Sequence, residues 1–237
     1  MNSCASSTRR SAYIVRGATW FYPAPRAAEA SDGDLLAQVK APLIELDAGN
    51  VLLEHSIAYA GAWERAFAYC PIERDPTAYW PIDRWDVERL SGERLTKLRQ
   101  CFDEEFGSTI PAIGGAHCAC HAMTDADSEL VCVSAIGPAF EVRSLRNLRR
   151  LGCPIERVIA TSSATDAGNP KARAIGTLAP VAFVDDYLPY LCGIDDGVHS
   201  ALVMRQPTGS SNRGPDLARA RSKHQDLAGF AEWWLAD

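Results

Sequence analysis

The sequence predicts an α/β fold: a Rossmann-like parallel sheet with helices on both faces and a small inserted helical cap. Three observations support this fold class. From residue 42 onward, short apolar runs alternate with helical patterns, in the rhythm of repeated strand and helix units. Most of these runs are apolar throughout, which is typical of strands covered on both faces. After the first run come roughly eighty residues with a helical pattern, too long for a simple connection.

Composition limits the partners that we expect. The 237 residues are 47% hydrophobic and 23% charged, as in ordinary globular proteins. The net charge of −6 provides no basic surface for nucleic acid, and no run of ~18 apolar residues predicts a membrane span. The eight cysteines are irregularly spaced, which favours buried thiols in a reducing compartment. We therefore expect a cytoplasmic protein that binds neither nucleic acid nor membrane; the oligomeric state stays open.

Residues 1–34 are rich in serine, arginine, alanine and proline, and no acidic residue precedes Glu29. This composition superficially resembles a transit peptide, and Arg9-Arg10 resembles a twin-arginine signal. Because Arg16 interrupts the apolar stretch after that pair, secretion is not supported. We expect a disordered extension, with a targeting segment as the alternative.

The predicted elements follow the pattern of apolar residues along the chain. The strands, in order, are Leu43 to Leu46, Glu129 to Val133, Arg157 to Ala160, Val181 to Val184 and Ser200 to Met204. The helices between and after them are Phe140 to Leu151, Lys171 to Leu178 and Asp226 to Leu235. Gly152 is a natural C-cap for the first helix, and Asn169-Pro170 is a start signal for the second.

Between the first and second strands, Leu52 to Tyr69 and Arg84 to Phe106 have helical patterns, and Pro71 to Pro81 is loop-like. We interpret residues 54–110 as a helical cap inserted into a core formed by residues 35–53 and 111–237. Five large side chains of the cap either contact a ligand or pack in its interior, and we expect packing: Trp63, Arg65, Tyr79, Trp80 and Trp85.

The segment from His117 to His121 contains four residues that can ligate metal, since two cysteines lie between the histidines. A structural zinc site pairs its ligands at characteristic spacings, and no second Cys-x-x-Cys or His-x-x-x-His pair follows. We therefore expect a plain helix here rather than a metal site.

Polar residues follow the carboxyl ends of the predicted strands, where ligands bind in parallel α/β sheets. Asp47 follows the first strand, Ser134-Ala135 the second and Asp185-Asp186 the fourth, and Lys171 opens the helix before the fourth. A carboxylate can attack phosphorus, and others can hold Mg²⁺, which prefers oxygen ligands. A hydroxyl, a lysine and backbone N–H groups can bind the transferred phosphoryl oxygens. Singly, each residue also fits a turn or a helix cap.

In this order, the residues resemble the four motifs of the haloacid dehalogenase superfamily, over residues 42 to 235. Leu43 to Leu52 is similar to the first motif in its Asp-x-Gly-Asn variant, Val131 to Ser134 to the second, Lys171 to the third and Ala182 to Asp186 to the fourth.

The resemblance implies a Rossmann-like core with a helical cap that determines substrate specificity. It implies that Asp47 forms an aspartyl-phosphate and binds Mg²⁺ together with the Gly49 carbonyl and Asp185. Asp186 is then a further metal ligand or a support for Lys171. The resemblance also implies that the phosphoryl group is held by Ser134, Ala135 and Lys171.

The chain departs from the superfamily pattern two residues after Asp47. The usual residue there is a carboxylate that protonates the leaving group and activates water, but this chain has Gly49. Loss of such a group typically costs about 10²–10⁴ in rate. His55 is either its replacement or a surface residue at the cap hinge, which we favour. Glu45, in the central strand, either supports the site or has a structural role.

We predict a Mg²⁺-dependent phosphatase that acts on a small phosphorylated metabolite through an aspartyl-phosphate. One alternative is a catalytically weak or inactive protein of the same fold that binds a phosphometabolite, because Gly49 replaces the acid/base. Another is a metal-independent 2-haloacid dehalogenase, in which Asp47 attacks carbon. The pair Asp185-Asp186 disfavours the dehalogenase, since a metal-free site for an anionic substrate has little use for two further carboxylates.

Overall fold

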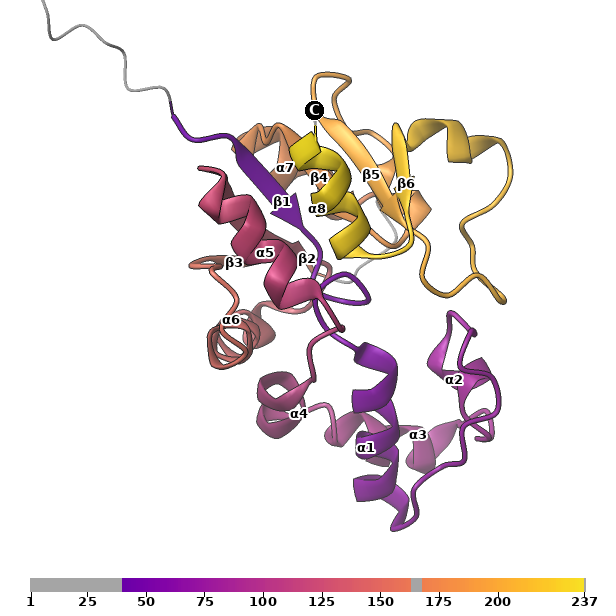
Figure 1. The fold of residues 1–237 in the computed structure, drawn as a ribbon. Coiled ribbons are helices and arrows are strands. Elements are labelled where there is room, and N and C mark those ends of the chain that lie inside the picture. Colours follow the sequence, from indigo (N-terminus) through magenta and orange to yellow (C-terminus); the bar gives the residue numbers. More distant parts are fainter. Residues whose placement is uncertain (1–39, 163–167, 237) are drawn as a thin grey trace, which may run out of the picture. The chain divides into compact units, whose positions relative to one another are not determined.

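The computed structural model describes residues 40–162 and 168–236. The extension predicted at residues 1–34 therefore lies outside the described residues. The described chain forms a six-stranded sheet in the order β3-β2-β1-β4-β5-β6, and all of its strand pairs are parallel (Figure 1). The α/β class and the parallel sheet predicted from the sequence are confirmed.

The strands lie close to their predicted positions. Their bounds are β1 Leu43–Leu46, β2 Glu129–Ser134, β3 Val158–Ala160, β4 Ala182–Asp185, β5 His199–Val203 and β6 Ser222–His224. The prediction missed β6 because this edge strand has the polar sequence Ser-Lys-His and no buried residue, so it lacks the apolar run that indicates a strand.

The central position of β1 determines where the polar strand ends meet. Leu46 of β1 pairs with Cys132 of β2 on one side and with Val184 of β4 on the other. The Asp47 N–H then donates to the Val184 carbonyl at 3.0 Å, which ties the residue after β1 to the end of β4. The residues that follow these three strands therefore lie at one edge of the sheet.

Helices cover both faces of the sheet, as predicted. The side chains of β4 alternate between two apolar clusters: Ala182 and Val184 belong to one, and Phe183 to the other. The first cluster includes residues of α5 (Ala116–Asp125) and α8 (Leu227–Ala236), which pack against each other. The second includes Ile175 of α7 (Ala172–Leu178). The remaining core helix is α6 (Glu141–Arg150), preceded by a 3₁₀ turn.

Four helices lie between β1 and α5: α1 (His55–Phe67), α2 (Pro81–Arg84), α3 (Gly92–Gln100) and α4 (Glu104–Thr109). The prediction of one continuous helix from Arg84 to Phe106 was wrong, because this segment contains two separate helices, α3 and α4. The chain is extended after Trp85, and the Asp103 carboxylate accepts a hydrogen bond from the Phe106 N–H at 3.0 Å, which starts α4 as a separate helix.

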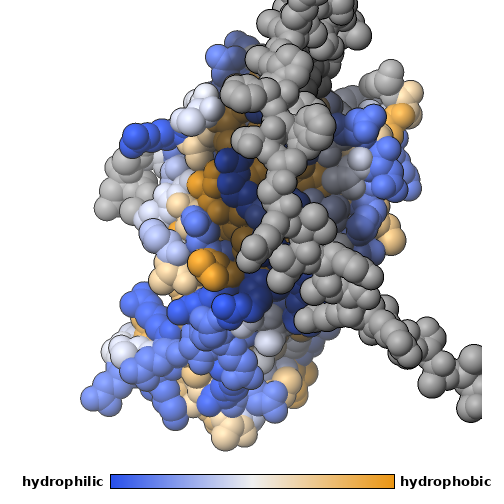
Figure 2. Space-filling view, turned by 90° about the vertical axis from the view of Figure 1, so that its left-hand side faces the viewer, coloured by the Kyte–Doolittle hydropathy of each residue, from blue (hydrophilic) through white to orange (hydrophobic). Residues whose placement is uncertain are grey.

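These four helices, which we call the cap, have their own packed interior. Trp63 is 0% exposed and lies 4.7 Å from the Phe67 ring, centroid to centroid. The Trp85 indole donates to the Ser56 carbonyl at 2.8 Å, which fixes the loop after α2 against α1. The cap surface is mostly hydrophilic in the lower part of Figure 2, in keeping with α3, where the buried residue is Leu98.

The chain enters and leaves the cap at adjacent points, since Leu53 and Ala112 form an antiparallel bridge. A second contact joins the cap to the loop after β5, where the Tyr79 N–H donates to the Thr208 carbonyl at 2.9 Å. Glu54 adds ion pairs with Arg84 of α2 and with Arg205 of that loop. Within the described residues, no helix is long and apolar enough to cross a lipid bilayer.

Candidate active site

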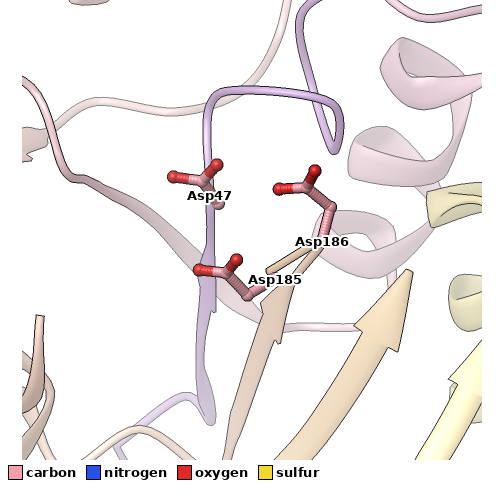
Figure 3. Close-up of side chains that lie close together, drawn as sticks. All are labelled: Asp47, Asp185 and Asp186. Atoms are coloured by element: carbon pink, nitrogen blue, oxygen red, sulfur yellow. The ribbon is translucent and has the colours of Figure 1, made fainter. Parts of the chain in front are cut away.

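Three aspartates lie together at the carboxyl ends of the central strands (Figure 3). Asp47 follows β1, Asp185 ends β4 and Asp186 comes directly after it. One oxygen from each lies within 4.8 Å of the others. They are 8%, 0% and 7% exposed, respectively, so the three carboxylates are close together and largely shielded from water.

Lys171 reaches these carboxylates from the start of α7. Its side chain is fully buried, and its Nζ donates to Asp47 Oδ1 at 2.6 Å and to Asp185 Oδ2 at 2.5 Å. Burial alone lowers the pKa of Lys171, but Asp185, Asp47 and Glu45 outweigh it and raise the pKa above its ordinary value. The amine therefore stays protonated between two carboxylates.

One ammonium group does not balance three carboxylates. Burial, followed by repulsion from Asp185 and Asp47, raises the pKa of Asp186 to about 8, although hydrogen bonds from Asn50 and Tyr79 oppose the rise. Burial also raises the pKa of Asp185, against the opposite effect of Lys171. Such a site favours a bound cation, because a positive charge relieves this repulsion.

The donor atoms present fit Mg²⁺, which prefers oxygen ligands in near-octahedral arrangement. Besides the three carboxylates, Asn50 contributes a buried Oδ1 that has no hydrogen-bond partner among the described residues. Its Nδ2 donates to Asp186 Oδ2 at 3.0 Å, so this side chain points to the carboxylate cluster. The Gly49 carbonyl accepts from the Val51 N–H at 2.7 Å and keeps its second lone pair for a ligand.

Ser134 and Ala135 follow β2 beside the aspartates. Ser134 is 4% exposed, and its carbonyl accepts from the Thr161 N–H at 3.0 Å, which fixes the backbone after β2 against the end of β3. Both residues line the same cavity as Asp47. The structure thus brings together every residue that the sequence predicted for the site.

This cavity has a volume of about 620 Å³ and lies between the strand ends and the cap. From the cap it is lined by His55, Tyr59, Tyr79, Trp80, Pro81, Ile82, Phe102 and Ile110. From the core it is lined by Asp47, Ala48, Gly49, Asn50, Leu53, Ser134, Ala135, Ile136, Ser144, Asp186, Tyr187 and Tyr190. Its volume is within the range of small-molecule sites, about 300–1,000 Å³.

The expectation that the large cap residues pack in its interior is right for Trp63 and Trp85 and wrong for Tyr79 and Trp80, which line the cavity. Arg65 does not line the cavity, and its guanidinium forms ion pairs with Asp103 and Glu105 at the start of α4. The error has a physical cause: whether an aromatic residue faces inward or toward the core depends on the cap's position, which no local pattern records.

His55 is the first residue of α1 and lines the cavity with Asp47. Its ring packs edge-on against Phe106, with centroids 5.6 Å apart. Burial lowers the pKa of His55, although Asp47 and Glu54 act in the opposite direction, so its imidazole is neutral near pH 7. His55 therefore lies at the cap hinge, as the favoured interpretation had it, but it is half-buried in the cavity wall and does not lie on the open surface.

Glu45 is buried inside the sheet and hydrogen-bonds the backbone of a neighbouring strand. Its side chain is 0% exposed, and its Oε1 accepts from the Val133 N–H at 3.1 Å. Burial raises the pKa of Glu45 well above its ordinary value, in spite of Lys171, which favours the uncharged carboxyl. It does not line the cavity, although it is close enough to Lys171, Asp185 and Asp47 to interact with them electrostatically.

The histidines and cysteines from His117 to His121 lie on α5, as a plain helix. In the described part of the chain, the aspartate cluster is the one group of three or more His, Cys, Asp or Glu residues arranged to hold a metal ion. The seven cysteines described are free thiols.

Sequence reasoning missed three residues at the site: Asn50, Tyr187 and Tyr190. Asn50 has a left-handed backbone, with φ of 54°, which asparagine tolerates better than most residues. Its position in the Asp-x-Gly-Asn motif was a usable signal. Tyr187 directly follows Asp185-Asp186, so it too was within reach of a motif-based argument, whereas Tyr190 belongs to a 3₁₀ turn without a motif.

This architecture is similar to that of several solved proteins. No family model and no curated protein matches the chain. A solved L-2-haloacid dehalogenase is 16% identical, with a TM-score of 0.52 over 81% of this chain and 99% of its own. A haloacid dehalogenase family hydrolase from Deinococcus radiodurans, with bound phosphate and sodium, is 17% identical, with a TM-score of 0.53 over 80% and 94%. A predicted phosphatase from Clostridium acetobutylicum is 12% identical, with a TM-score of 0.56 over 83% and 99%.

The chain therefore has the haloacid dehalogenase-like fold, in agreement with the resemblance of its motifs. Proteins of this fold among its neighbours include both phosphatases and dehalogenases, so the choice between these two chemistries depends on the site itself.

Proposed function

We propose that the protein is a Mg²⁺-dependent phosphatase that hydrolyses a small phosphorylated metabolite through an aspartyl-phosphate on Asp47. The observation that carries this proposal is the set of three buried carboxylates within 4.8 Å of one another, with a single lysine between two of them. This imbalance favours a divalent cation. The neighbour from Deinococcus radiodurans, with its bound phosphate, supports the same chemistry.

Asp47 has the position of a nucleophile. Lys171 holds its Oδ1 at 2.6 Å, which leaves Oδ2 for attack. That oxygen lies on the Gly49 side, where a Cβ added to Gly49 would lie 3.5 Å from it. In the first step Oδ2 bonds to phosphorus while the bond from phosphorus to the alcohol oxygen breaks, and the alcohol oxygen keeps the electron pair.

The remaining residues bind the phosphoryl group and the ion. The Ser134 hydroxyl, the Ala135 N–H and the Lys171 ammonium would receive the phosphoryl oxygens as negative charge develops on them. Asp47, the Gly49 carbonyl, Asp185 and Asp186 would hold the Mg²⁺. When bound, this ion screens the repulsion between the attacking carboxylate and the anionic ester.

The second step needs a base, and Gly49 supplies none. We assign this role to His55, which lines the cavity and is neutral near pH 7. Its imidazole takes a proton from the incoming water while the water oxygen bonds to phosphorus. The bond from Asp47 to phosphorus then breaks, which returns the carboxylate and releases phosphate.

The test is hydrolysis of p-nitrophenyl phosphate by the purified protein with Mg²⁺ and with EDTA, beside an Asp47→Asn variant. We expect activity with Mg²⁺, loss of activity in EDTA and a loss of at least about 10³-fold in the variant. A wild-type protein without metal-dependent activity on this ester and on a panel of phosphorylated metabolites would contradict the proposal.

Two solved neighbours are 2-haloacid dehalogenases, so a second function has support from the fold. In that reaction the carboxylate of Asp47 would attack carbon without a metal. Halide release from 2-chloropropionate in EDTA, with no hydrolysis of phosphate esters, would favour this function. The cluster Asp185-Asp186 beside Asp47 argues against it, since it repels a 2-haloacid carboxylate when no cation is bound.

A further inference from the structure

We infer that the substrate is a phosphate monoester of an uncharged aromatic alcohol, of the phenol type. This inference rests on the proposed phosphatase function and names its substrate class. Three features of the cavity carry it: an aromatic wall shared by cap and core, the nature of its charged groups, and the missing acid at Gly49.

The aromatic wall consists of Tyr79 and Trp80 from the cap and Tyr187 and Tyr190 from the core. Their rings contact each other in sequence: Tyr79 lies 4.9 Å from Trp80, Trp80 lies 6.2 Å from Tyr187, and Tyr187 lies 4.9 Å from Tyr190, centroid to centroid. Trp80 is 39% exposed, although a large apolar side chain is better buried. A flat ring in the cavity would cover part of that surface, and aromatic pairs add to the energy of burial.

The hydroxyl group of Tyr79 does not make this wall a site for charged ligands. This hydroxyl donates a hydrogen bond to Asp186, so it is turned toward the carboxylates and the ring remains as part of the wall.

The charged groups of the cavity disfavour a second anionic group on the substrate. Among its described lining residues none is lysine or arginine, while Asp47 and Asp186 are both present. The buried Lys171 is already held by two carboxylates. A bisphosphate, a nucleotide or a phosphorylated carboxylic acid would therefore place its second anion in apolar or acidic surroundings.

A sugar phosphate fits poorly for a different reason. Its hydroxyl groups need hydrogen-bond partners when they leave water, or they cost free energy. Beyond the phosphoryl site, most of the lining is the aromatic wall and apolar residues such as Leu53, Phe102, Ile110 and Ile136. The further polar side chains there are Tyr59, Ser144 and His55, which are too few to satisfy all the hydroxyl groups of a sugar. A phosphorylated quaternary ammonium would be attracted by rings and acids, but the cavity of about 620 Å³ is far larger than a cage around methyl groups requires.

The missing carboxylate at Gly49 points to the same class of alcohol. Without a general acid, the leaving oxygen departs with its electron pair and no proton, which is easier for a weakly basic oxygen. A phenol has a pKa near 10, several units below that of an aliphatic alcohol. His55 lines the cavity in surroundings that disfavour the charged imidazolium, so it is a poor general acid for the leaving oxygen.

Four monoesters separate these contributions in assays with Mg²⁺: phenyl phosphate, benzyl phosphate, glucose 6-phosphate and phosphocholine. Phenyl phosphate has both the ring and the weakly basic oxygen, and benzyl phosphate has the ring alone. We expect kcat/KM to fall in the order phenyl, benzyl, glucose 6-phosphate, with at least about 10²-fold between the first and the last. A higher kcat/KM for glucose 6-phosphate or phosphocholine than for phenyl phosphate would overturn the inference.

Trp80→Ala tests the aromatic wall. We expect kcat/KM for phenyl phosphate to fall about tenfold, with Trp80→Phe within about threefold of wild type, because a ring is retained. Ile72→Ala is the matched control, since Ile72 is an apolar cap residue that is 75% exposed and does not line the cavity. An equal kcat/KM in Trp80→Ala and wild type would contradict a role for this ring.

Binding of benzylphosphonate, followed by tryptophan fluorescence, tests the site without turnover. If no monoester is hydrolysed but benzylphosphonate binds to wild type and binds at least fivefold more weakly to Trp80→Ala, the phosphatase proposal fails and the aromatic site stands. If monoesters are hydrolysed but methylphosphonate binds as tightly as benzylphosphonate, the phosphatase stands and the aromatic site is wrong.

Discussion

At the scale of single residues, the unusual part of the proposed mechanism is proton transfer. Gly49 stands where the superfamily pattern has a carboxylate, and His55 is the proposed base. A Cβ at Gly49 would meet Asp47 Oδ2 at 3.5 Å, an ordinary contact, and the Gly49 backbone is not in the left-handed region. A side chain can therefore be added there without strain. This allows the missing carboxylate to be restored by substitution.

We predict that His55→Ala slows hydrolysis about 10²-fold, because water then attacks the aspartyl-phosphate without a base. The slowed step follows release of the alcohol, so stopped-flow with p-nitrophenyl phosphate would show a burst of one nitrophenol per enzyme. Gly49→Asp in the His55→Ala background would recover at least tenfold, and Gly49→Asn, the matched control, would not. A His55→Ala variant with the wild-type rate would remove His55 from the mechanism.

The buried Glu45 leads to a prediction about stability. Glu45→Gln keeps the acceptor for the Val133 N–H and the uncharged state, so we expect the free energy of unfolding to change by less than about 1 kcal/mol. Glu45→Leu removes the acceptor from a buried N–H and would cost about 1–3 kcal/mol. Urea unfolding of the three proteins measures both values. Equal losses in the two variants would show that a charged carboxylate is needed.

At this scale the sequence was informative because strand ends in a parallel sheet converge. Asp47, Ser134 and Asp185-Asp186 each follow an apolar run, so their meeting could be predicted without coordinates. The environment of His55 could not, since it depends on the angle at which α1 leaves Leu53 and on Phe106, 51 positions further along the chain.

Among the elements of the cap, α1 contributes Trp63 to the packed interior, and the segment from Tyr79 to Ile82 lines the cavity. Trp63 of α1 is 0% exposed, whereas Trp80 before α2 is 39% exposed and faces the cavity. The two tryptophans belong to the same small cap, but one packs in its interior and the other lines the cavity. Substitution of Trp63 is therefore expected to change the stability of the cap, and substitution of Trp80 is expected to change substrate binding.

We predict that Trp63→Ala lowers the free energy of unfolding by about 3–5 kcal/mol, as expected when a large buried ring leaves a cavity. Trp80→Ala would lower it by less than about 1 kcal/mol. Denaturant titrations followed by circular dichroism give both values on the same scale. Comparable losses for the two variants would contradict the assignment of Trp80 to recognition.

The elements themselves were predictable where hydrophobic patterns are strong. The five predicted strands lie within one residue of their predicted bounds, and β1 and β4 are buried along their whole length. The pattern failed for β6, a polar edge strand, and for α3 and α4, which read as one helix. Ser91 is the N-cap of α3 and Asp103 is the N-cap of α4, and such local breaks are weak signals inside a charged segment.

For the molecule as a whole, the binding of a cation should stabilise the fold, because the native state holds three buried carboxylates beside one lysine. The unfolded chain separates these charges, so a cation binds the native state better. A ligand at 100 times its Kd adds about 2.7 kcal/mol to stability.

We predict that saturating Mg²⁺ raises the Tm of the wild-type protein by several degrees and that Asp186→Asn removes most of this rise. Asp216→Asn is a suitable control, because Asp216 is exposed and pairs with Arg219 on the surface. Differential scanning calorimetry with Mg²⁺ and with EDTA gives the comparison. The same rise in Tm for Asp186→Asn and Asp216→Asn would place the cation elsewhere.

The cavity between cap and core was the least predictable feature of the whole molecule. Its position follows from contacts far apart in sequence, such as the bridge between Ala78 and Thr208. The motif residues define where phosphorus would lie, whereas the aromatic wall, from two separate segments, defines what else would fit.

The central claim is that Asp47 attacks phosphorus, and mass spectrometry of the acid-quenched enzyme tests it most directly. Wild-type protein and the Asp47→Asn variant are mixed with excess phenyl phosphate and Mg²⁺, quenched in acid within milliseconds and digested. We predict a phosphorylated peptide whose modification maps to Asp47 in the wild type and is absent from the variant. Rapid release of phosphate from phenyl phosphate with no phosphorylated Asp47, or turnover undiminished in Asp47→Asn, would contradict it.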